Sequence, residues 1–184
     1  MALSLAAVSA QRRAHALRYL REEDRKLSLA VYLLLLEALE KEYGITRPPE
    51  FGFGPHGKPF LPDYPHIHFN LSHCSGAALC VVGDTPAGCD IERVQEPLDM
   101  DLCRRCCSPE EMASVLGSRN PALAFCTLWT RKEAFLKYTG EGLTDRLQGL
   151  LGTPEASSVR IESHVADDES FVYSICRSLV EEPV

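Results

Sequence analysis

Gly88-Cys89-Asp90-Ile91-Glu92 is followed, about forty residues later, by Trp129-Thr130-Arg131-Lys132-Glu133-Ala134-Phe135-Leu136-Lys137. The first stretch is typical of a short strand, in which Asp90 and Glu92 point to the same face. The second has helical spacing, which places Trp129, Glu133 and Lys137 on one stripe. If the strand and the helix pack together, three carboxylates converge with a lysine one turn beyond.

This arrangement predicts a site for a hard divalent cation and a phosphorylated ligand. Oxygen ligands that leave positions for water and phosphate suit magnesium, which rarely receives a complete protein cage. Asp90 and Glu92 would repel each other unless a cation lay between them. Simpler interpretations remain open, because Glu133 and Lys137 also fit a helix-stabilising ion pair and the strand carboxylates could face solvent.

The composition indicates one compact globular unit. The chain has 184 residues and 20.4 kDa, of which 45% are hydrophobic and 24% charged, and a chain of this length buries about 70% of its unfolded surface. The longest apolar run, Leu29 to Leu36, is too short to cross a bilayer. Met1 to Ala10 lacks the basic region of a signal peptide, and we expect a cytoplasmic protein without membrane attachment.

The eight cysteines are predicted to be buried free thiols in a reducing compartment rather than disulfides, because most of them lie in apolar segments. One C-x-x-C runs from Cys103 to Cys106. It has no second pair at zinc-site spacing, so we do not expect a metal there.

Charge is distributed unevenly along the chain. Residues 1–87 carry nine basic and nine acidic side chains, whereas residues 88–184 carry ten and seventeen, which gives the net charge of −7. The segment from Gln11 to Lys26 nevertheless concentrates six Lys and Arg residues with His15. The overall charge argues against nucleic-acid binding, while this local patch fits either an anion site or a solvated helix face.

The fold class predicted is α+β, with two tandem pseudo-symmetric halves at residues 1–87 and 88–184 and an active site between them. In each half a helix packs on antiparallel strands. The first half is predicted to have a helical segment from Arg12 to Tyr43, with a break near Asp24, and strands at Ile67–Leu71 and Gly76–Val82.

The second half opens with a predicted strand, Pro86–Glu92, and closes with strands at Ser157–Val165 and Ser170–Cys176. Between them, Ser108-Pro109 and Asn120-Pro121 are cap-and-proline signals for two helix starts. Gly140 is a suitable C-terminal residue for the second of these helices, which we expect to span Pro121 to Thr139.

The two motifs quoted first resemble the G-x-D-I-E and W-x-x-K-E-A-x-x-K signatures of the 4′-phosphopantetheinyl transferases. Gly57-Lys58-Pro59 and Phe69-Asn70-Leu71-Ser72-His73 are similar to the G-K-P and F-N-x-S-H motifs of the two-half, surfactin-synthetase-activating class of that family. Four motifs in the same order make the resemblance specific.

The resemblance implies a magnesium-dependent enzyme that transfers the 4′-phosphopantetheine arm of coenzyme A to a serine of an apo acyl or peptidyl carrier protein. The implied metal ligands are Asp90, Glu92 and Glu133, and the implied catalytic residues are Glu133, Lys137 and Asp90. The residues implied to contact coenzyme A are Arg12, His15, Ser28, Gly57, Lys58, Pro59, Ser72, His73 and Lys137. A monomer is expected, because the site would lie between two halves of one chain.

The chain also departs from the family pattern. Only ten residues precede Gln11, where the family has a further strand and helix, so we expect a shortened first half; His15 stands where lysine is usual, and Cys74 where a second serine is usual. A carrier-binding patch is predicted between the halves at Leu102, Arg104, Arg105, Met112, Val115 and Leu116. Two other functions stay open: a magnesium-dependent nucleotide phosphohydrolase, and a non-catalytic protein that binds coenzyme A or a carrier.

Overall fold

The computed structural model describes residues 8–142 and 147–179. Most of the N-terminal stretch considered above for a signal peptide lies outside these residues. The first part of the fold consists of α1 (Ala10–Ala16), α2 (Glu22–Tyr43), β1 (Gly52–Phe53), β2 (Pro59–Phe60), β3 (His68–Cys74) and β4 (Ala77–Gly83). The predicted order of helix followed by hairpin is confirmed.

The second part also follows the predicted order. It consists of β5 (Ala87–Arg93), α3 (Met100–Cys106), α4 (Pro109–Leu116), α5 (Pro121–Thr139), β6 (Val159–Val165) and β7 (Phe171–Ser178). Ser108 and Glu111 form the reciprocal capping box of α4. The Asn120 side chain caps α5, and Gly140 ends it in the left-handed region at φ 75°, so both predicted ends of this helix are confirmed.

The predicted break in the first helical segment is confirmed, although Asp24 itself lies within a helix. The first helix ends at Ala16 and the second begins at Glu22, so the break lies in residues 17–21. Asp24 lies in the first turn of α2 together with Glu22 and Glu23. Carboxylates interact favourably with the positive end of the helix dipole, and these three residues therefore favour the start of a helix.

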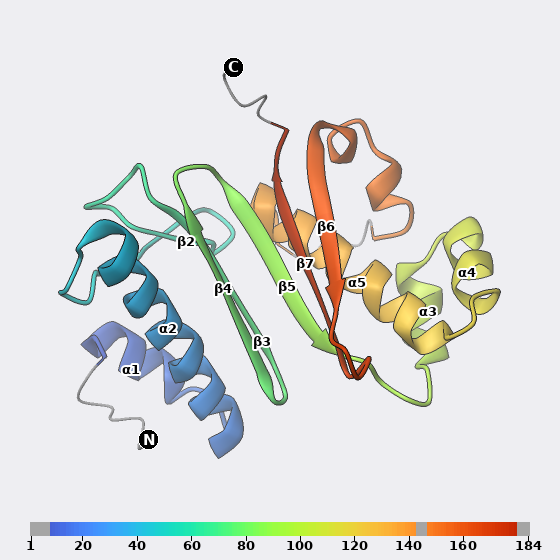
Figure 1. Ribbon diagram of the computed structural model, residues 1–184, viewed down its shortest axis with the longest axis horizontal. Helices are drawn as coiled ribbons and strands as arrows, with labels where there is room; N and C mark the ends of the chain where they lie inside the picture. The colour runs from blue at the N-terminus through green and yellow to red at the C-terminus, as the bar shows by residue number, and fades with distance from the viewer. Residues whose placement is uncertain (1–7, 143–146, 180–184) are drawn as a thin grey trace.

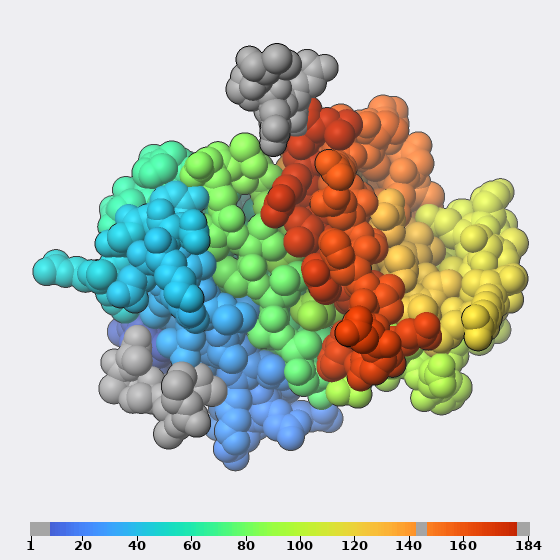
Figure 2. Space-filling view, viewed as in Figure 1, coloured from blue at the N-terminus to red at the C-terminus, as the bar shows by residue number. Residues whose placement is uncertain are grey.

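Two antiparallel sheets lie side by side (Figure 1). One pairs β3 with β4 and is covered by α2, whereas the other has the order β5-β7-β6 and packs on α5. In Figure 2 the green β4–β5 segment is visible between the blue helical layer and the red hairpin of the C-terminal strands. The predicted α+β class is confirmed, and the structural equivalence of two halves stays a prediction.

Side chains join the two sheets where β3 runs beside β5. Asn70 Oδ1 accepts a hydrogen bond from the Cys89 backbone N–H at 2.8 Å, and Ser72 Oγ accepts one from the Ile91 N–H at 3.4 Å. Both bonds link residues nineteen positions apart, so the strands run parallel in a fixed register. Backbone groups that a ladder would pair are satisfied here by side chains.

The second sheet lies unusually close to α5 at Gly88. A Cβ atom at this position would stand 2.1 Å from the Ala134 carbonyl oxygen and 2.3 Å from the Tyr138 nitrogen. Any side chain larger than that of glycine would therefore push β5 away from the helix. The close approach brings the carboxylates of β5 next to those of α5.

All eight cysteines are free, and six of them are buried. The buried thiols lie mainly in the apolar clusters under α3 to α5 and behind the second sheet, where they pack as small hydrophobic residues. Within residues 8–142 and 147–179, no helix has the length and apolar character needed to cross a membrane.

Candidate active site

Asp90 lies at the centre of the site, on β5, and is only 3% exposed. Its Oδ1 accepts hydrogen bonds from Lys137 Nζ at 2.6 Å and from Ser72 Oγ at 2.8 Å. Its Oδ2 is buried and has no hydrogen-bond partner among the described residues. Buried carboxylate oxygens nearly always have a partner, so Oδ2 is available to a bound ligand or ion.

Ser72 connects the three elements that meet at Asp90. Its hydroxyl donates to Asp90 and accepts from Lys137 Nζ at 2.9 Å and from the Ile91 N–H. The hydroxyl thus uses both its donor and its acceptor capacity. Strands β3 and β5 and helix α5 are tied together at a single oxygen atom.

Glu133 lies one helical turn before Lys137, and its Oε1 is also buried without a partner in the described residues. Burial raises the pKa of Glu133, the charge of Asp90 raises it further, and Lys137 lowers it. Burial, together with the negative charges of Asp90 and Glu133, raises the pKa of Glu92 to about 7, against opposing effects of Lys137 and Trp129. The charge of Asp90 thus raises the pKa values of both Glu92 and Glu133, as expected of acids that share one region.

No group of three His, Cys, Asp or Glu side chains in the part of the chain that the structure describes is already arranged to hold a metal ion. Lys137 provides the positive charge next to Asp90 instead. The donor set nevertheless fits magnesium, because two buried carboxylate oxygens, Asp90 Oδ2 and Glu133 Oε1, have no partner and because magnesium binds hard oxygen ligands.

A cluster of positive side chains lies at the other end of the site. The Arg12 guanidinium stands over the Tyr32 ring at 5.5 Å, and its Nη1 lies 3.5 Å from His15 Nδ1. Tyr19 makes edge contacts with the rings of both His15 and His73. The cluster thus joins α1, the segment before α2, and β3.

The histidines of this cluster are held close to other cations. Burial lowers the pKa of His15, as do Arg12, Arg18 and His73. Burial also lowers the pKa of His73, with further contributions from Arg12 and Lys137, while Asp24 raises it. These effects favour neutral imidazoles, and a bound anion would offset them by favouring the protonated forms.

Ser28 has a different place from the one expected of a ligand contact. It is fully buried on α2, and both its hydroxyl and its carbonyl oxygen accept hydrogen bonds from Arg12 Nη2, the former at 2.8 Å. Ser28 therefore orients the Arg12 guanidinium and is not itself accessible to a ligand.

Two neighbouring cavities connect the acidic and basic ends. A cavity of about 270 Å³ is lined by Glu133, Lys137 and the 56–59 segment, and a cavity of about 210 Å³ is lined by Arg12, His15, Tyr19 and His73. Gly57, Pro59 and Leu71 line both cavities. An elongated anionic ligand can therefore extend from the carboxylates past this shared wall to the positive cluster.

Gly57 shapes the shared wall, because its φ of 83° permits the tight turn between β1 and β2. Pro59 follows as the first residue of β2. The Lys58 ammonium group, which the motif resemblance placed with the ligand contacts, instead donates hydrogen bonds to the carbonyl oxygens of Tyr138 and Ala87.

A partly apolar groove of about 530 Å³ lies beside Glu92, and charged side chains such as Arg93, Glu96 and Asp99 form part of its wall. Its walls include Leu98, Leu102, Phe125 and Trp129. Glu92 therefore lies between the polar site and a surface that suits an uncharged, partly apolar chain.

Sequence reasoning did not assign roles to three residues that support the site. Asn70 holds β3 in register with β5. Its position two residues before Ser72, on the same face of the strand, is the sequence signal that could have indicated this role. Tyr19 separates the two histidines and carries no comparable signal. Lys132 is buried and donates to Glu111 and to the carbonyl oxygens of Cys106 and Leu147.

The predicted carrier-binding patch does not lie between the two sheets. Its residues belong to α3 and α4, which stand at the side of the molecule opposite to α1 and α2 (Figure 1). Val115 is buried in the apolar cluster beneath these helices, whereas Arg104, Arg105 and Leu116 are exposed. The patch therefore combines part of the core with part of the outer surface.

Comparisons with known proteins point to one enzyme family. Residues 86–176 match the 4′-phosphopantetheinyl transferase superfamily. A protein from Bacillus pumilus named 4′-phosphopantetheinyl transferase psf-1 is 31% identical over 176 residues, which cover 91% of this chain and 74% of that protein. The chain belongs to the 4′-phosphopantetheinyl transferase superfamily.

Two further phosphopantetheinyl transferases, both from Bacillus subtilis, are similar over a shorter region. One is 36% identical over 76% of this chain, and the other, named Sfp, is 29% identical over 74% of it. The chain spans only 63% and 62% of the lengths of these two relatives. The acidic site and the basic cavity are therefore discussed below as parts of a proposed phosphopantetheinyl transferase activity.

Proposed function

We propose that this chain transfers the 4′-phosphopantetheine arm of coenzyme A to a serine hydroxyl of an apo acyl or peptidyl carrier protein and releases 3′,5′-ADP. The observation that carries the proposal is the pair of buried, unpartnered carboxylate oxygens on Asp90 and Glu133 beside Lys137. Glu133 and Lys137 line the first of two adjoining cavities, and Arg12, His15 and His73 line the second. Coenzyme A has a matching series of charges, with a pyrophosphate and a separate 3′-phosphate.

The ligand would be held mainly by charge. Arg12, His15 and His73 are assigned to the phosphates of the nucleotide, Lys137 and Ser72 to the pyrophosphate, and the backbone of Gly57 and Pro59 to the adenine end. Positive groups that already repel one another favour a bound phosphate, whatever the net charge of the protein.

Asp90, Glu92 and Glu133 are assigned as the ligands of magnesium. The ion, when bound, would neutralise the pyrophosphate oxygens. Burial and the negative charge of Asp90 raise the pKa values of Glu92 and Glu133. A bound cation would offset both effects, which supports this assignment.

In the proposed reaction the carrier serine oxygen attacks the phosphorus that bears the pantetheine arm. A new phosphorus–oxygen bond forms, and the bond from this phosphorus to the bridging oxygen of 3′,5′-ADP breaks. Glu133 accepts the serine proton, either directly or through a water molecule that it orients. Lys137 donates a hydrogen bond to the phosphoryl oxygens, on which negative charge accumulates.

The pantetheine arm is assigned to the partly apolar groove beside Glu92. The arm carries methyl groups and amides but no charge, and the groove is lined by Leu98, Leu102, Phe125 and Trp129. A ligand with its pyrophosphate at Asp90 could then extend its two ends in opposite directions, the nucleotide toward Arg12 and the arm toward Trp129.

Residues 1–87 and 88–184 are proposed as two functional halves, the first for the nucleotide and the second for the metal and chemistry. One chain then supplies all the groups of the site, so we propose a monomer. The cytoplasm is the proposed location, because eight free thiols suit a reducing compartment.

The test is incubation of the protein with coenzyme A, Mg²⁺ and an apo carrier protein, followed by mass spectrometry of the carrier. A mass gain of one phosphopantetheine per carrier is the expected result. Release of phosphate without a carrier would instead identify a phosphohydrolase. Binding of coenzyme A without any mass gain would identify a non-catalytic binding protein, and either outcome would overturn the proposal.

A further inference from the structure

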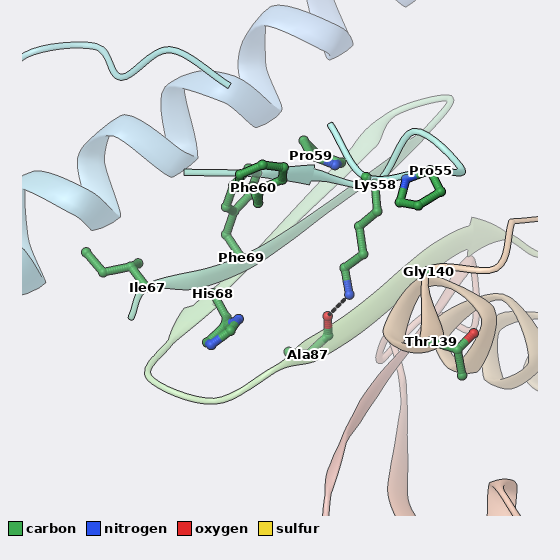
Figure 3. A pocket seen from close by; sticks show the side chains of 11 residues that line it. Pro55, Lys58, Pro59, Phe60, Ile67, His68, Phe69, Ala87, Thr139 and Gly140 are labelled. Atoms are coloured by element: carbon green, nitrogen blue, oxygen red, sulfur yellow. Dashed lines mark hydrogen bonds between the residues drawn. The ribbon is translucent and has the colours of Figure 1, made fainter. Parts of the chain in front are cut away.

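Lys58 links the turn between β1 and β2 to the catalytic elements. Its Nζ donates a hydrogen bond to the Tyr138 carbonyl oxygen at 2.9 Å and one to the Ala87 carbonyl oxygen at 3.3 Å. Figure 3 shows the extended side chain reaching from the turn to Ala87, beside Gly140. Tyr138 lies in the last turn of α5 and Ala87 is the first residue of β5, so the ammonium group bonds to both elements that carry the carboxylates.

The two carbonyl oxygens suit a positive charge. Tyr138 contributes one of the last four carbonyl groups of α5, which have no partner within the helix, and the C-terminal end of a helix is negative. Among the described residues no carboxylate pairs with Lys58, whose pKa is lowered by burial. Carbonyl dipoles alone therefore hold the ammonium group.

Two glycines make this contact possible. Gly88 allows β5 to approach the α5 backbone closely, which brings the Ala87 and Tyr138 carbonyl groups within reach of one ammonium group. A Cβ atom at Gly140 would lie 3.2 Å from Lys58 Cδ, and this glycine also has a φ of 75°. The end of α5 is thus shaped around the Lys58 side chain.

The turn has its own hydrogen bonds, and the chain that leads into it is anchored at Phe51, which packs on Phe69 and is hydrogen-bonded to Gln11. The Gly54 N–H donates to the Lys58 carbonyl oxygen at 2.9 Å, and the Gly57 N–H donates to the Gly54 carbonyl oxygen at 3.0 Å. In the described residues β1 and β2 pair only with each other. Phe51 thus fixes the start of this segment against β3 and α1, whereas the Lys58 side chain ties the turn to the end of α5.

We propose that Lys58 is a positioning residue, whose ammonium group clamps the 54–58 turn to the junction of α5 and β5 and does not contact the phosphates of the substrate. The clamp fixes the wall formed by Gly57 and Pro59 at a set distance from Asp90 and Glu133. The identity of the ligand rests on the proposed function, whereas the clamp itself is a property of the free protein.

Amide hydrogen exchange of the ligand-free protein tests the clamp directly. In Lys58→Met, which keeps the apolar stem and removes the charge, the Gly54 and Gly57 amides are expected to exchange about tenfold faster. Lys58→Gln, which can still donate one hydrogen bond, should lie between wild type and Lys58→Met. Lys41→Met, which removes an exposed ion pair on α2, is the matched control. Unchanged exchange at Gly54 and Gly57 in Lys58→Met would overturn the proposal.

Ligand affinity then separates positioning from direct contact. A displaced turn should weaken coenzyme A, 3′-dephospho-coenzyme A and 3′,5′-ADP by a similar factor, about tenfold for Lys58→Met. A loss confined to the ligands that share one phosphate would show that Lys58 touches that phosphate, contrary to the proposal. Wild-type protein that binds none of these ligands would refute the proposed function and leave the exchange experiment as the test of the clamp.

Discussion

Lys137 Nζ lies 2.6 Å from Asp90 Oδ1, and the two groups form a largely buried ion pair between α5 and β5. The ammonium group pairs with Oδ1, whereas the unpartnered Oδ2 is the oxygen that remains for a divalent cation, so lysine and cation would share one carboxylate charge. A cation that binds the carboxylate weakens the hold of Asp90 on Lys137, and the freed ammonium group can then turn to a phosphate. In the proposed function, metal binding and phosphate binding would be coupled through this pair.

Lys137→Met is expected to lower the rate of carrier modification by about 100-fold or more, because a fixed positive charge at the reacting phosphate is lost. Without metal, the variant should also unfold at a lower temperature, since Asp90 is left buried with neither oxygen paired to a cation. Mg²⁺ should raise the melting temperature of Lys137→Met more than that of wild type. Equal shifts in both proteins would contradict the competition between lysine and metal.

Glu133→Gln is expected to keep the fold and to lower kcat by about 100-fold or more, because the amide cannot accept the serine proton. Circular dichroism checks the fold, and the time course of carrier mass measures the rate. Glu37→Gln, on the exposed face of α2, is the control. Carrier modification by Glu133→Gln at the wild-type rate would refute the assignment of the base.

Glu92→Gln is expected to stabilise the metal-free protein at neutral pH while it abolishes transfer. The pKa of Glu92 is about 7 in the folded protein, whereas an unperturbed glutamate, as in the unfolded chain, has a pKa of 4.5. Between these values the unfolded chain loses its proton first, so the free energy of unfolding of wild type falls as the pH rises from about 4.5 to about 7.

Gln has no such proton to lose, so the pH dependence should be flatter in the Glu92→Gln variant. Denaturant unfolding at pH 4.5 and pH 7.5 measures the difference between the two proteins. The variant should gain stability over wild type only at the higher pH, and a gain of the same size at pH 4.5 would exclude ionisation of Glu92 as the cause.

Coenzyme A affinity should fall as the pH rises from about 5.5 to 7.5. The pKa of His15 lies below its usual value because of burial and because of Arg12, Arg18 and His73. A bound phosphate favours the protonated imidazole, so binding takes up a proton and weakens when protons are scarce.

His15→Gln removes this contribution, and the difference between the wild-type and variant pH profiles isolates it from ionisation of the phosphate itself. Calorimetric titration measures both profiles. His15→Lys should bind coenzyme A with less dependence on pH in this range. Parallel profiles for wild type and His15→Gln would show that His15 does not contact the 3′-phosphate.

Leu98→Asp should raise the KM for coenzyme A by about tenfold, because it places a charge in the groove assigned to the pantetheine arm. The affinity for 3′,5′-ADP, which lacks this arm, should stay the same. Leu34→Asp, a partly exposed leucine on α2, serves as the control. An equal loss for both ligands would place the arm elsewhere or indicate a change in the whole site.

Local signals predicted the parts of this fold that depend on neighbours in sequence. Asn120, Pro121 and Gly140 specify both ends of α5 through backbone hydrogen bonds and a left-handed residue. The alternation around Asp90 and the helical spacing of Glu133 and Lys137 were sufficient to place these groups on facing surfaces. The same reasoning placed the break of the first helical segment a few residues too late, at Asp24, which lies in the first turn of α2.

Contacts between distant segments could not be predicted in this way. Nothing near Lys58 in the sequence indicates that its partners are carbonyl groups 29 and 80 residues away. The burial of Ser28 and its bonds to Arg12 depend on how α1 packs against α2. The location of the α3–α4 surface depends on the path that the chain takes after β5. Such facts follow from tertiary packing, which residue spacing does not encode.

Gly88 imposes a strict geometric tolerance on the whole centre. A single carbon atom added at Gly88 would overlap Ala134 on α5. A substitution here would therefore change the distance between Asp90 on β5 and Lys137 on α5. In a saturation library of this chain, position 88 should accept fewer substitutions than the residues that carry out the chemistry. A change in one functional group affects one step, whereas a displaced β5 moves all the groups of the site out of alignment.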